Sequence, residues 1–573
     1  MRHGKWASLV IAALVLGCAP SSSTQSPSRP DAAQPGGPSG APKALDIAIS
    51  EDPGNFWDAV TGGGGSGVRE LGHSVNSFLA TTASDGAPLP RLLSELPAID
   101  KGTWRVLPDG GMETTYKLRP GVTWHDGRAF TADDVVFSWQ VNADPDVPNS
   151  NQGTVRLISG MEARDPSTVV ATWTEQYPFA DRMGHRDLYT VPRHLLERTY
   201  QETKDGLLTV PYWTDEYVGL GPYRVTKWDR GSVLEVRAYD KYFLGQPKID
   251  TIRFRFMPDP NTMVANLYAH AIQSVLPPGG PDLEAMSLVK REWESTGYGS
   301  IAVEVPRWKF MEAQKLNNPQ PRDLADPRSR QGLLLAINRA ELATTVFGEY
   351  GVVADSWVHP SFKHYARVQE GIVRYPFDQQ RASAVLAEMG WRRGADGVLE
   401  KADGQRFTLT MRTRDDQKEA LIIADNWKQI GVIASYEQQT PQELRDRAAR
   451  AQYTGMDISR GSMPPSTIIR SLATEQIPTV ENRFAGSNRG GYSSAAWDEL
   501  GRRFLSELDE NRRNDLERDL ARVLTTDLPL MPLMYDPDMI ATGGGLTGMQ
   551  PAVGTSHNGQ IMHTWNIHEW DIK

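Results

Sequence analysis

Residues 114–139 read TTYKLRPGVTWHDGRAFTADDVVFSW and form the most informative stretch of the chain. Residues 116–118 alternate apolar and polar side chains as a strand does, the Arg-Pro-Gly run at 119–121 predicts a turn, and Val122–Trp124 predicts a second strand. Thr131, three residues before an aspartate, has the spacing of a capping box that opens a helix. The stretch therefore predicts a hairpin followed by a helix.

Further strands are predicted on both sides of this stretch. Leu45–Ile49 alternates as a strand does. Gly219–Tyr223 precedes a strand, residues 228–232 predict a turn, and Val233–Ala238 alternates again, which indicates consecutive antiparallel strands. We interpret Gly219 and Gly221 as residues that allow a tight turn rather than as ligand contacts.

The second half of the chain alternates helix and strand signals. Asp326-Pro327 places an N-cap and a first-turn proline in their preferred positions, and glycines end several of the expected helices. The expected elements are a helix from Pro327, helices at Ala340–Phe347 and Asp378–Met389, a strand at Phe407–Met411, a helix that stops at Gly431, helices at about Ala495–Leu508 and Arg512–Thr526, and a strand at Leu530–Tyr535. Such alternation is typical of an α/β lobe. The C-terminal tail is expected to be irregular.

The composition indicates a large and mostly globular protein. The chain has 573 residues, of which 39% are hydrophobic and 23% charged. It is too long for one hydrophobic core and too apolar for general disorder. The 61 basic and 71 acidic residues give a net charge of −10, and such a surface repels phosphate backbones. We therefore expect two or three lobes and no nucleic-acid partner.

The first 18 residues, MRHGKWASLVIAALVLGC, have the pattern of a signal peptide. Their apolar run is shorter than the roughly 20 residues that a membrane-spanning helix needs. Residues 15–18, VLGC, resemble the bacterial lipobox, which implies a lipid on Cys18; the alternative is an ordinary cysteine near a cleavage site. In residues 19–43, 15 of 25 are Pro, Gly or Ser, which predicts a disordered tether.

Catalytic and metal-binding motifs are missing from the sequence. It has no G-x-S-x-G, no H-E-x-x-H and no phosphate-loop lysine. Residues 62–67 satisfy G-x-G-x-x-G formally, but the strand that a dinucleotide site needs before this motif is absent. His563 and His568 lack helical metal spacing and are assigned to the irregular tail. Since Cys18 is the only cysteine, no disulfide is expected. We expect a binding protein rather than an enzyme, with no cofactor and no metal.

Five segments occur in the order and at the distances of one family: TYKLRPGVTWHDGRAFTADDVVFSW, GLGPYRVTKWDRGS, DPRSRQGLLLAINR, FDQQRASAVLAEMGW and NWKQIGV. Together they resemble the extracellular solute-binding proteins of family 5, the peptide and nickel receptors of ABC importers, from Ala44 to about Tyr535. The resemblance implies an α/β fold of the periplasmic-binding-protein type II, cluster C-like. This is a two-lobed clamshell that closes on a ligand, with an extra subdomain on the first lobe.

The implied domain organisation comprises a lipoprotein signal peptide at 1–18, the tether at 19–43, lobe I at 44–305 with its subdomain at about 75–205, lobe II at 306–530, and a return to lobe I at 531–573. The chain is expected to cross between the lobes near Pro306–Phe310 and Leu530–Tyr535. These two crossings would be the hinge strands.

Two arginines near the end of the expected strand at 407–414 are candidate ligand contacts. Alternation places Arg412 and Arg414 on the face opposite Phe407. By resemblance to the dipeptide-binding branch, Arg414 binds the ligand carboxylate, a task that suits the guanidinium fork; the alternative is a solvated arginine. The segment Asp457–Ser466, DISRGSMPPS, lacks the tryptophan and the acid that hold a peptide's amino group in that branch, and the histidine of the nickel branch is also missing.

Aromatic residues are the other candidate ligand contacts. Trp57, Trp308 and Trp357 lie in or near segments that border the cleft in the family, and Tyr223 is a fourth candidate. Aromatic walls supply apolar area to a ligand with little specificity. The alternative for each is packing in a core, which applies to most of the 16 tryptophans of the chain.

The leading interpretation is a receptor that captures a peptide-like or carboxylate-bearing small solute and delivers it to the permease subunits of an ABC importer. Its lipid would hold it, as a monomer, on the outer side of a bacterial membrane, in the periplasm or at the cell surface. One alternative is a sensory or scaffold lipoprotein of the same fold that binds without transport. A remote alternative is a surface hydrolase, which the missing motifs disfavour.

Overall fold

The computed structural model describes residues 41–57, 68–147, 153–277, 279–317, 319–414, 417–551 and 562–573. The signal peptide with Cys18, almost all of the tether and the glycine-rich segment at 62–67 lie outside these ranges. Residues Pro42–Lys573 form one compact unit. Within the ranges described, no helix combines the length and the apolar character needed to cross a membrane.

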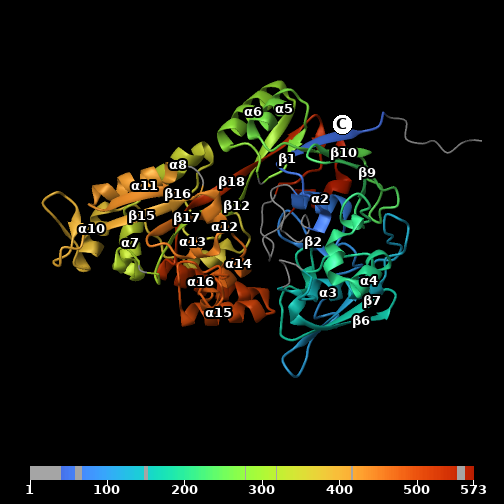
Figure 1. The fold of residues 1–573 in the computed structure, drawn as a ribbon, viewed down its shortest axis with the longest axis horizontal. Helices are drawn as coiled ribbons and strands as arrows, with labels where there is room; N and C mark the ends of the chain where they lie inside the picture. The colour runs from blue at the N-terminus through green and yellow to red at the C-terminus, as the bar shows by residue number, and fades with distance from the viewer. Residues whose placement is uncertain are drawn as a thin grey trace, which may run out of the picture. The chain divides into compact units, whose positions relative to one another are not determined.

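The first lobe is built on a mixed five-stranded sheet with the order β11-β1-β10-β9-β8. Strand β1 pairs in parallel with β10 and β11, whereas β10, β9 and β8 are antiparallel. The strands expected at the start of the body and after Gly221 are thus confirmed. The elements of this part are β1 (Ala44–Ile49), α2 (Val68–Val75), β8 (Tyr223–Asp229), β9 (Val233–Ala238), β10 (Thr251–Phe256), α5 (Pro260–Tyr268), β11 (Ser274–Val275) and α6 (Leu283–Thr296) (Figure 1).

A second sheet follows α2 in the chain, in the region expected to hold the extra subdomain. Its four antiparallel strands have the order β4-β5-β7-β6, and helix α3 packs against β6 and β7 (Figure 1). The elements are β2 (Ala80–Thr82), β3 (Pro88–Pro90), β4 (Trp104–Val106), β5 (Met112–Lys117), α3 (Ala132–Ala143), β6 (Ile158–Asp165), β7 (Thr168–Trp173) and α4 (Arg193–Glu202).

The informative stretch at 114–139 behaves mostly as expected. Thr131 and Asp134 form both contacts of the capping box at the start of α3. The second strand predicted at Val122–Trp124 is wrong, because only Thr123 forms a bridge, to Ala129. The turn that follows directly at 125–127 leaves this segment too short to join a sheet.

The second lobe contains another five-stranded sheet, with the order β16-β15-β17-β12-β18. The expected helices and strands of this half are confirmed to within a few residues, except that the strand expected at Leu530–Tyr535 continues to Gly543. The strands are β12 (Gly299–Ala313), β13 (Arg392–Arg393), β14 (Leu399–Glu400), β15 (Thr408–Thr413), β16 (Ile433–Gln438), β17 (Met456–Ser462) and β18 (Leu530–Gly543). The helices are α7 (Pro327–Leu335), α8 (Arg339–Phe347), α9 (Tyr365–Val368), α10 (Gln379–Glu388), α11 (Lys418–Gln429), α12 (Pro441–Arg445), α13 (Arg447–Ala451), α14 (Pro465–Ser471), α15 (Ala495–Ser506) and α16 (Glu510–Asp527).

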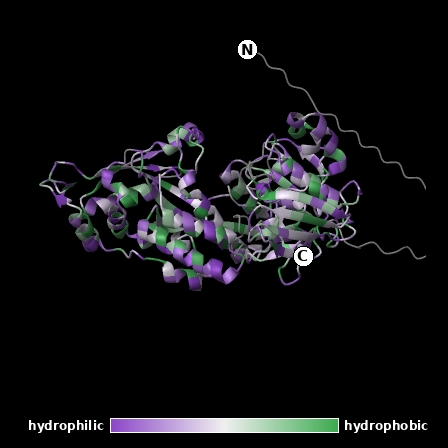
Figure 2. Ribbon diagram, turned by 90° about the horizontal axis from the view of Figure 1, so that it is seen from below, coloured by the Kyte–Doolittle hydropathy of each residue, from purple (hydrophilic) through white to green (hydrophobic). Residues whose placement is uncertain are grey.

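Helices of both lobes present one apolar face to a core. Hydrophilic and hydrophobic segments alternate along the helices in Figure 2, as amphipathic helices require. Helix α15 buries Trp497 and Phe504, and strand β15 buries Leu409 and Met411. The predicted inward face of β15 is therefore confirmed.

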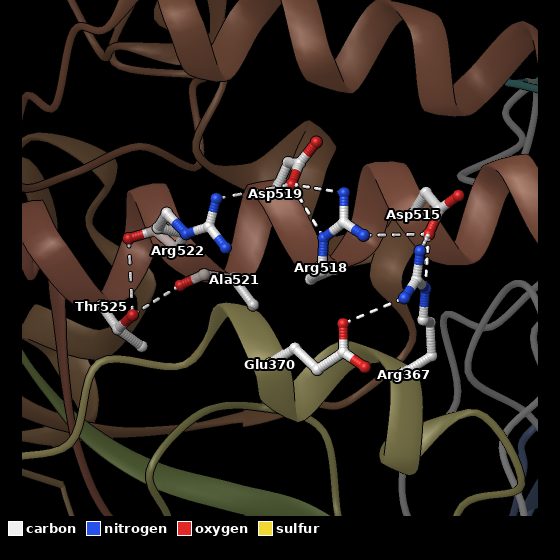
Figure 3. A network of polar contacts seen from close by, with 8 residues as sticks. All are labelled: Arg367, Glu370, Asp515, Arg518, Asp519, Ala521, Arg522 and Thr525. Atoms are coloured by element: carbon white, nitrogen blue, oxygen red, sulfur yellow. Dashed lines mark hydrogen bonds and ion pairs between the residues drawn. The ribbon is translucent and has the colours of Figure 1, made fainter.

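An ion pair between Arg367 and Asp515 joins α9 to α16, and further ion pairs flank it on each side (Figure 3). Arg367 pairs with Glu370 and Asp515, and Arg518 bridges Asp515 to Asp519. Most of these side chains are substantially exposed, so each pair contributes only about 0–1 kcal/mol. The contact between these helices therefore depends mainly on the buried apolar residues that lie between them, such as Val368.

Two long strands, β12 and β18, run through both lobes. They pair antiparallel from Gly299 opposite Gly543 to Glu312 opposite Leu530, and β17 joins β12 over its second half. A break in register between Glu304 and Arg307 lies opposite Asp536–Asp538. Strand β18 continues beyond the expected crossing at Leu530–Tyr535, to Gly543, and the position of the crossings stays a prediction.

The C-terminal tail is more ordered than the sequence indicates. After β18, the described residues form β19 (Leu546–Thr547), the 3-10 helix η9 (His563–Glu569) and β20 (Asp571–Ile572), and β19 pairs with β20. Trp570 is fully buried in the core of the first lobe. The prediction of an irregular tail is therefore wrong for these segments, whose burial depends on contacts far away in the chain.

Gly219 and Gly221 allow two backbone segments to approach closely. A Cβ atom at Gly221 would lie 2.3 Å from the carbonyl carbon of Val75 and 2.4 Å from the nitrogen of Asn76, and one at Gly219 would lie 1.9 Å from the oxygen of Val75. The requirement for glycine therefore comes from the end of α2, which the sequence does not reveal, and not from the turn alone.

Gly221→Ala is expected to lower the free energy of unfolding by about 2 to 3 kcal/mol, because neither backbone can move without disturbing the sheet or α2. Gly160→Ala is the control, since a Cβ atom there meets nothing within 4 Å. Urea denaturation of both variants tests this expectation. Equal stability of the two variants would contradict it.

Candidate functional site

An open groove of about 1050 Å³ lies where segments of the two lobes face each other. One wall consists of the loop after β11 and the first turns of α6. The other consists of the end of α8, the start of α11 and one residue of β17, and the strands β12 and β18 form the floor. Grooves of this size between lobes are the usual place for a small ligand.

Two cationic side chains on the floor of the groove, Arg307 and Lys309, form ion pairs with acidic side chains of the protein. Arg307 donates to Asp536 through Nε and to both oxygens of Asp538 through its two Nη atoms, each at 2.8 Å. Burial alone would lower the pKa of Arg307, but the two carboxylates outweigh burial and raise it. Lys309 forms an ion pair with the buried Glu419 at the start of α11. These contacts fix the floor where the chain passes between the lobes.

The walls carry exposed charges of both signs. Arg460 of β17 and Lys418 of α11 line the groove from the second lobe, and Arg291 of α6 lines it from the first. The exposed acids Glu284 and Glu349 also line it. A wall with both signs of charge can hold a solute that has a carboxylate at one end and an amine at the other.

The two predicted arginines lie on the opposite face of the lobe II sheet from Lys309. The guanidinium of Arg412 donates to the carbonyl of Ala449 at 2.8 Å, pairs with Asp457 at 3.1 Å, and lies 4.3 Å from the ring centre of Tyr453. Arg414 follows the end of β15, is partly exposed, and has a buried Nε with no partner. Arg412 thus has partners for its Nη atoms, while the Nε atoms of both arginines are buried with no hydrogen-bond partner among the described residues. Neither residue lines the groove.

The four predicted aromatic residues lie inside the cores of the lobes. Trp57, Tyr223, Trp308 and Trp357 are at most 3% exposed, and none of them lines the groove. Trp57 packs edge-on against a second tryptophan at 5.0 Å, and the indole of Trp357 donates to Glu517 at 3.2 Å. Such packing is the alternative stated for each of them, and a ligand contact stays a prediction.

A buried charged cluster joins strand β12 to helix α2 of the first lobe. His563 contacts Glu70 of α2 through Nδ1 at 2.7 Å and Glu304 of β12 through Nε2 at 2.9 Å. Thr564 donates to Glu70 through its backbone N–H and its hydroxyl. The assignment of His563 to an irregular tail is therefore wrong, because the fold brings together three residues that are more than 200 positions apart.

The family-5 model, described as bacterial extracellular solute-binding proteins, family 5 Middle, matches residues 96–474. The chain therefore belongs to this family of extracellular solute-binding proteins.

Two curated relatives have peptide-binding descriptions. The chain is 25% identical to the oligopeptide-binding protein AppA of Bacillus subtilis over 346 residues, which cover 56% of this chain and 58% of AppA. It is 24% identical to the dipeptide-binding protein of Escherichia coli over 503 residues, which cover 81% of this chain and 87% of that protein.

Solved structures confirm the fold. The crystal structure of NikZ from Campylobacter jejuni in complex with Ni(L-His) has a TM-score of 0.71 at 22% identity, and covers 93% of this chain and 100% of NikZ. The oligopeptide-binding protein AppA from Bacillus subtilis with a nonapeptide has a TM-score of 0.68 at 20% identity, and covers 93% and 99%. The two-lobed α/β clamshell expected from the sequence is thus confirmed.

Sequence reasoning missed the residues that line the groove. Arg460 lies within DISRGSMPPS, the segment in which the resemblance implies an acidic anchor, and β17 places it opposite Lys309 of β12. Lys418 is the first residue of α11. The departure of that segment from the dipeptide pattern was the one available signal, and it did not indicate which residue takes the anchor's place.

Proposed function

We propose that the protein is the solute-binding receptor of an ABC importer. It captures a peptide-like or carboxylate-bearing solute in the groove between its lobes and releases it unchanged to the permease. The observation that carries this proposal is the groove of about 1050 Å³, with exposed charges of both signs, in a member of an extracellular solute-binding family. The peptide-binding descriptions of the relatives support the choice of solute.

The proposal includes a lipid on Cys18 and a flexible leash over residues 19–43. The leader sequence and the Pro, Gly and Ser content of the leash support both parts. A monomer on such a leash can reach the permease without leaving the membrane surface. The receptor carries out no chemistry, and the importer supplies the ATP hydrolysis.

A thermal-shift screen tests the binding function. Peptides of two to nine residues, amino acids and organic acids are added to the protein at a series of concentrations. A solute that binds only the folded state raises the Tm with concentration, by an amount that follows its affinity. A screen in which no solute shifts the Tm, at concentrations up to the millimolar range, contradicts the proposal.

A solute that extends from the groove to the end of β15 would lose a charged partner in Arg414→Ala, and its binding is then expected to weaken by about 2 to 5 kcal/mol. Calorimetric titration of the screened solute into both proteins measures the difference. Arg406→Ala is the control, because Arg406 is exposed just before β15 and its ion pair among the described residues is with the exposed Asp396. Equal affinity of wild type and Arg414→Ala would show that Arg414 is a solvated arginine.

A further inference from the structure

A small pocket lies inside the first lobe, apart from the groove between the lobes. Its volume is about 10 Å³, which is enough for one water molecule or one ion of similar size. Its walls come from α2 and the segment after it, from the residue that follows β3, and from η9 of the C-terminal tail. Its lining includes His73, Arg91, Tyr242, Trp565 and His568, and no residue lines both this pocket and the groove.

Arg91 brings a buried positive charge to this pocket. It is 7% exposed, and no carboxylate among the described residues lies within ion-pair distance of its guanidinium. Its Nη2 donates to the carbonyl of Trp565 at 2.5 Å, which is a neutral acceptor. Arg119, which donates to the carbonyl of Arg91 at 3.1 Å, adds a second positive charge, and Glu569 opposes the two from an exposed position. A buried cation without a close counter-charge is costly.

Two more polar atoms of the lining residues are buried without a hydrogen-bond partner among the described residues. They are Nε1 of Trp565 and Nδ1 of His568. An indole N–H can only donate. Burial and the charge of Arg91 lower the pKa of His568 to about 4, so its imidazole is neutral near neutral pH and can carry its proton on Nδ1. Its Nε2 lies 3.8 Å from Glu569, too far for a hydrogen bond that would hold the proton on that atom.

Among the described residues that line the pocket, none carries a negative charge. Burial lowers the pKa of His73 to about 4, so this imidazole is neutral as well. The Oδ1 atom of Asn76 already accepts from the backbone N–H of Leu220 at 3.1 Å. Glu70, the acid whose charge acts on His73, is bound by His563 at 2.7 Å. The lining is therefore rich in donors and has a net positive charge.

We propose that this pocket binds one small monovalent anion of the size of chloride. The anion would accept from the indole of Trp565 and from Nδ1 of His568, and it would balance the charge of Arg91. A water molecule would leave that charge unbalanced and would bring two more donors to a wall that already has them. Because the walls come from α2, the end of β3 and η9, the bound anion would tie the C-terminal tail to the first part of the lobe.

Crystals of the full chain grown in sodium bromide test the occupant directly. Bromide takes the place of chloride and scatters X-rays anomalously, whereas water does not. The expected result is an anomalous peak in the pocket, beside Arg91 and Nε1 of Trp565. A pocket that holds only a water molecule, or that holds nothing, would overturn the proposal.

Thermal unfolding in sodium chloride and in sodium acetate, at matched ionic strength, tests the site in solution, because acetate is too large for the pocket. Chloride is expected to raise the Tm by about 2 °C relative to acetate, since it binds only the folded state. Trp565→Phe keeps an aromatic ring but removes the donor, and it should lose most of this difference. Trp139→Phe is the control and should keep the difference, because its indole N–H has its own acceptor, the carbonyl of Val155 at 3.4 Å.

Arg91→Met is a second variant that should lose the chloride effect. A lower stability of this variant does not obscure the result, because the measured quantity is the difference between two salts for one protein. An equal chloride effect in wild type, Trp565→Phe and Arg91→Met would overturn the site. A bromide peak without any chloride effect in solution would also overturn it, as binding at crystal concentration only. Each of these outcomes leaves the proposed receptor function intact, because the pocket and the groove share no lining residue.

Discussion

His563→Ala is expected to lower the free energy of unfolding by about 3 to 5 kcal/mol, the largest effect of any single substitution considered. The change leaves Glu70 and Glu304 buried with no cation between them, and an uncompensated buried charge is costly. Both carboxylates are at most 4% exposed, so water cannot replace the imidazolium. The backbone bonds from residues 563 and 564 to Glu70 would remain but cannot neutralise two charges.

The effect of His563→Ala should depend on pH in a defined window. Burial alone would lower the pKa of His563, but Glu304 and Glu70 raise it well above 6.5. Burial alone would raise the pKa of Glu70, but His563 and Thr564 lower it to about 2. The raised pKa of His563 stabilises the folded state fully below about pH 6.5, and this contribution falls as the pH rises through the pKa that His563 has in the folded state. The lowered pKa of Glu70 stabilises the folded state above about pH 4.5, and this contribution falls as the pH drops toward 2.

The difference between wild type and His563→Ala should therefore be largest between about pH 4.5 and 6.5. Urea denaturation at a series of pH values measures it. His194→Ala is the matched control, because His194 forms an ion pair with Asp126, whose side chain is 30% exposed, and its effect should stay below about 1 kcal/mol. Similar losses for the two variants would contradict the role of the buried cluster.

Arg307→Ala is expected to cost about 3 kcal/mol of unfolding free energy. The arginine neutralises Asp536 and Asp538 on β18 at the point where the chain passes between the lobes. Both acids would face each other at the floor of the groove after the substitution, and Asp536 is only 6% exposed. The cost falls short of the full buried-pair value because the Arg307 side chain is itself 18% exposed.

The control for Arg307→Ala is Arg198→Ala. Arg198 is 86% exposed and pairs with Glu202 one helical turn away, so its loss should change stability by no more than about 0.5 kcal/mol. Calorimetric unfolding of both variants makes the comparison. If Arg307→Ala lost no more unfolding free energy than Arg198→Ala, water would be able to replace the contacts of Arg307 with Asp536 and Asp538 at no cost in stability, which would contradict this expectation.

Local signals predicted most elements of the fold. The capping pair at Thr131, the N-cap at Asp326 and the alternation in β15 depend on residues within a few positions of one another, and the structure confirms all three. The strand predicted at Val122–Trp124 failed because this segment pairs with residues 128–130 across the turn that follows, and neither segment joins a sheet among the described residues.

The candidate site was less accessible to sequence reasoning, for two physical reasons. Side chains such as Arg460 and Lys309 come together only through the pairing of strands that are far apart in the chain. Whether an aromatic residue can contact a ligand also depends on whether neighbouring residues bury it, and Trp308 is fully buried in the core. Of the two predicted arginines, Arg412 has hydrogen bonds within lobe II that only the folded chain reveals, and the sequence does not show that the Nε atoms of both are buried.

Equilibrium dialysis of the full chain against its screened solute, with mass spectrometry of the recovered solute, tests the central claim most directly. The account predicts saturable binding of one solute per chain and recovery of that solute with its mass unchanged. A solute that returns with an altered mass, or a protein that retains no solute at any concentration, would contradict it.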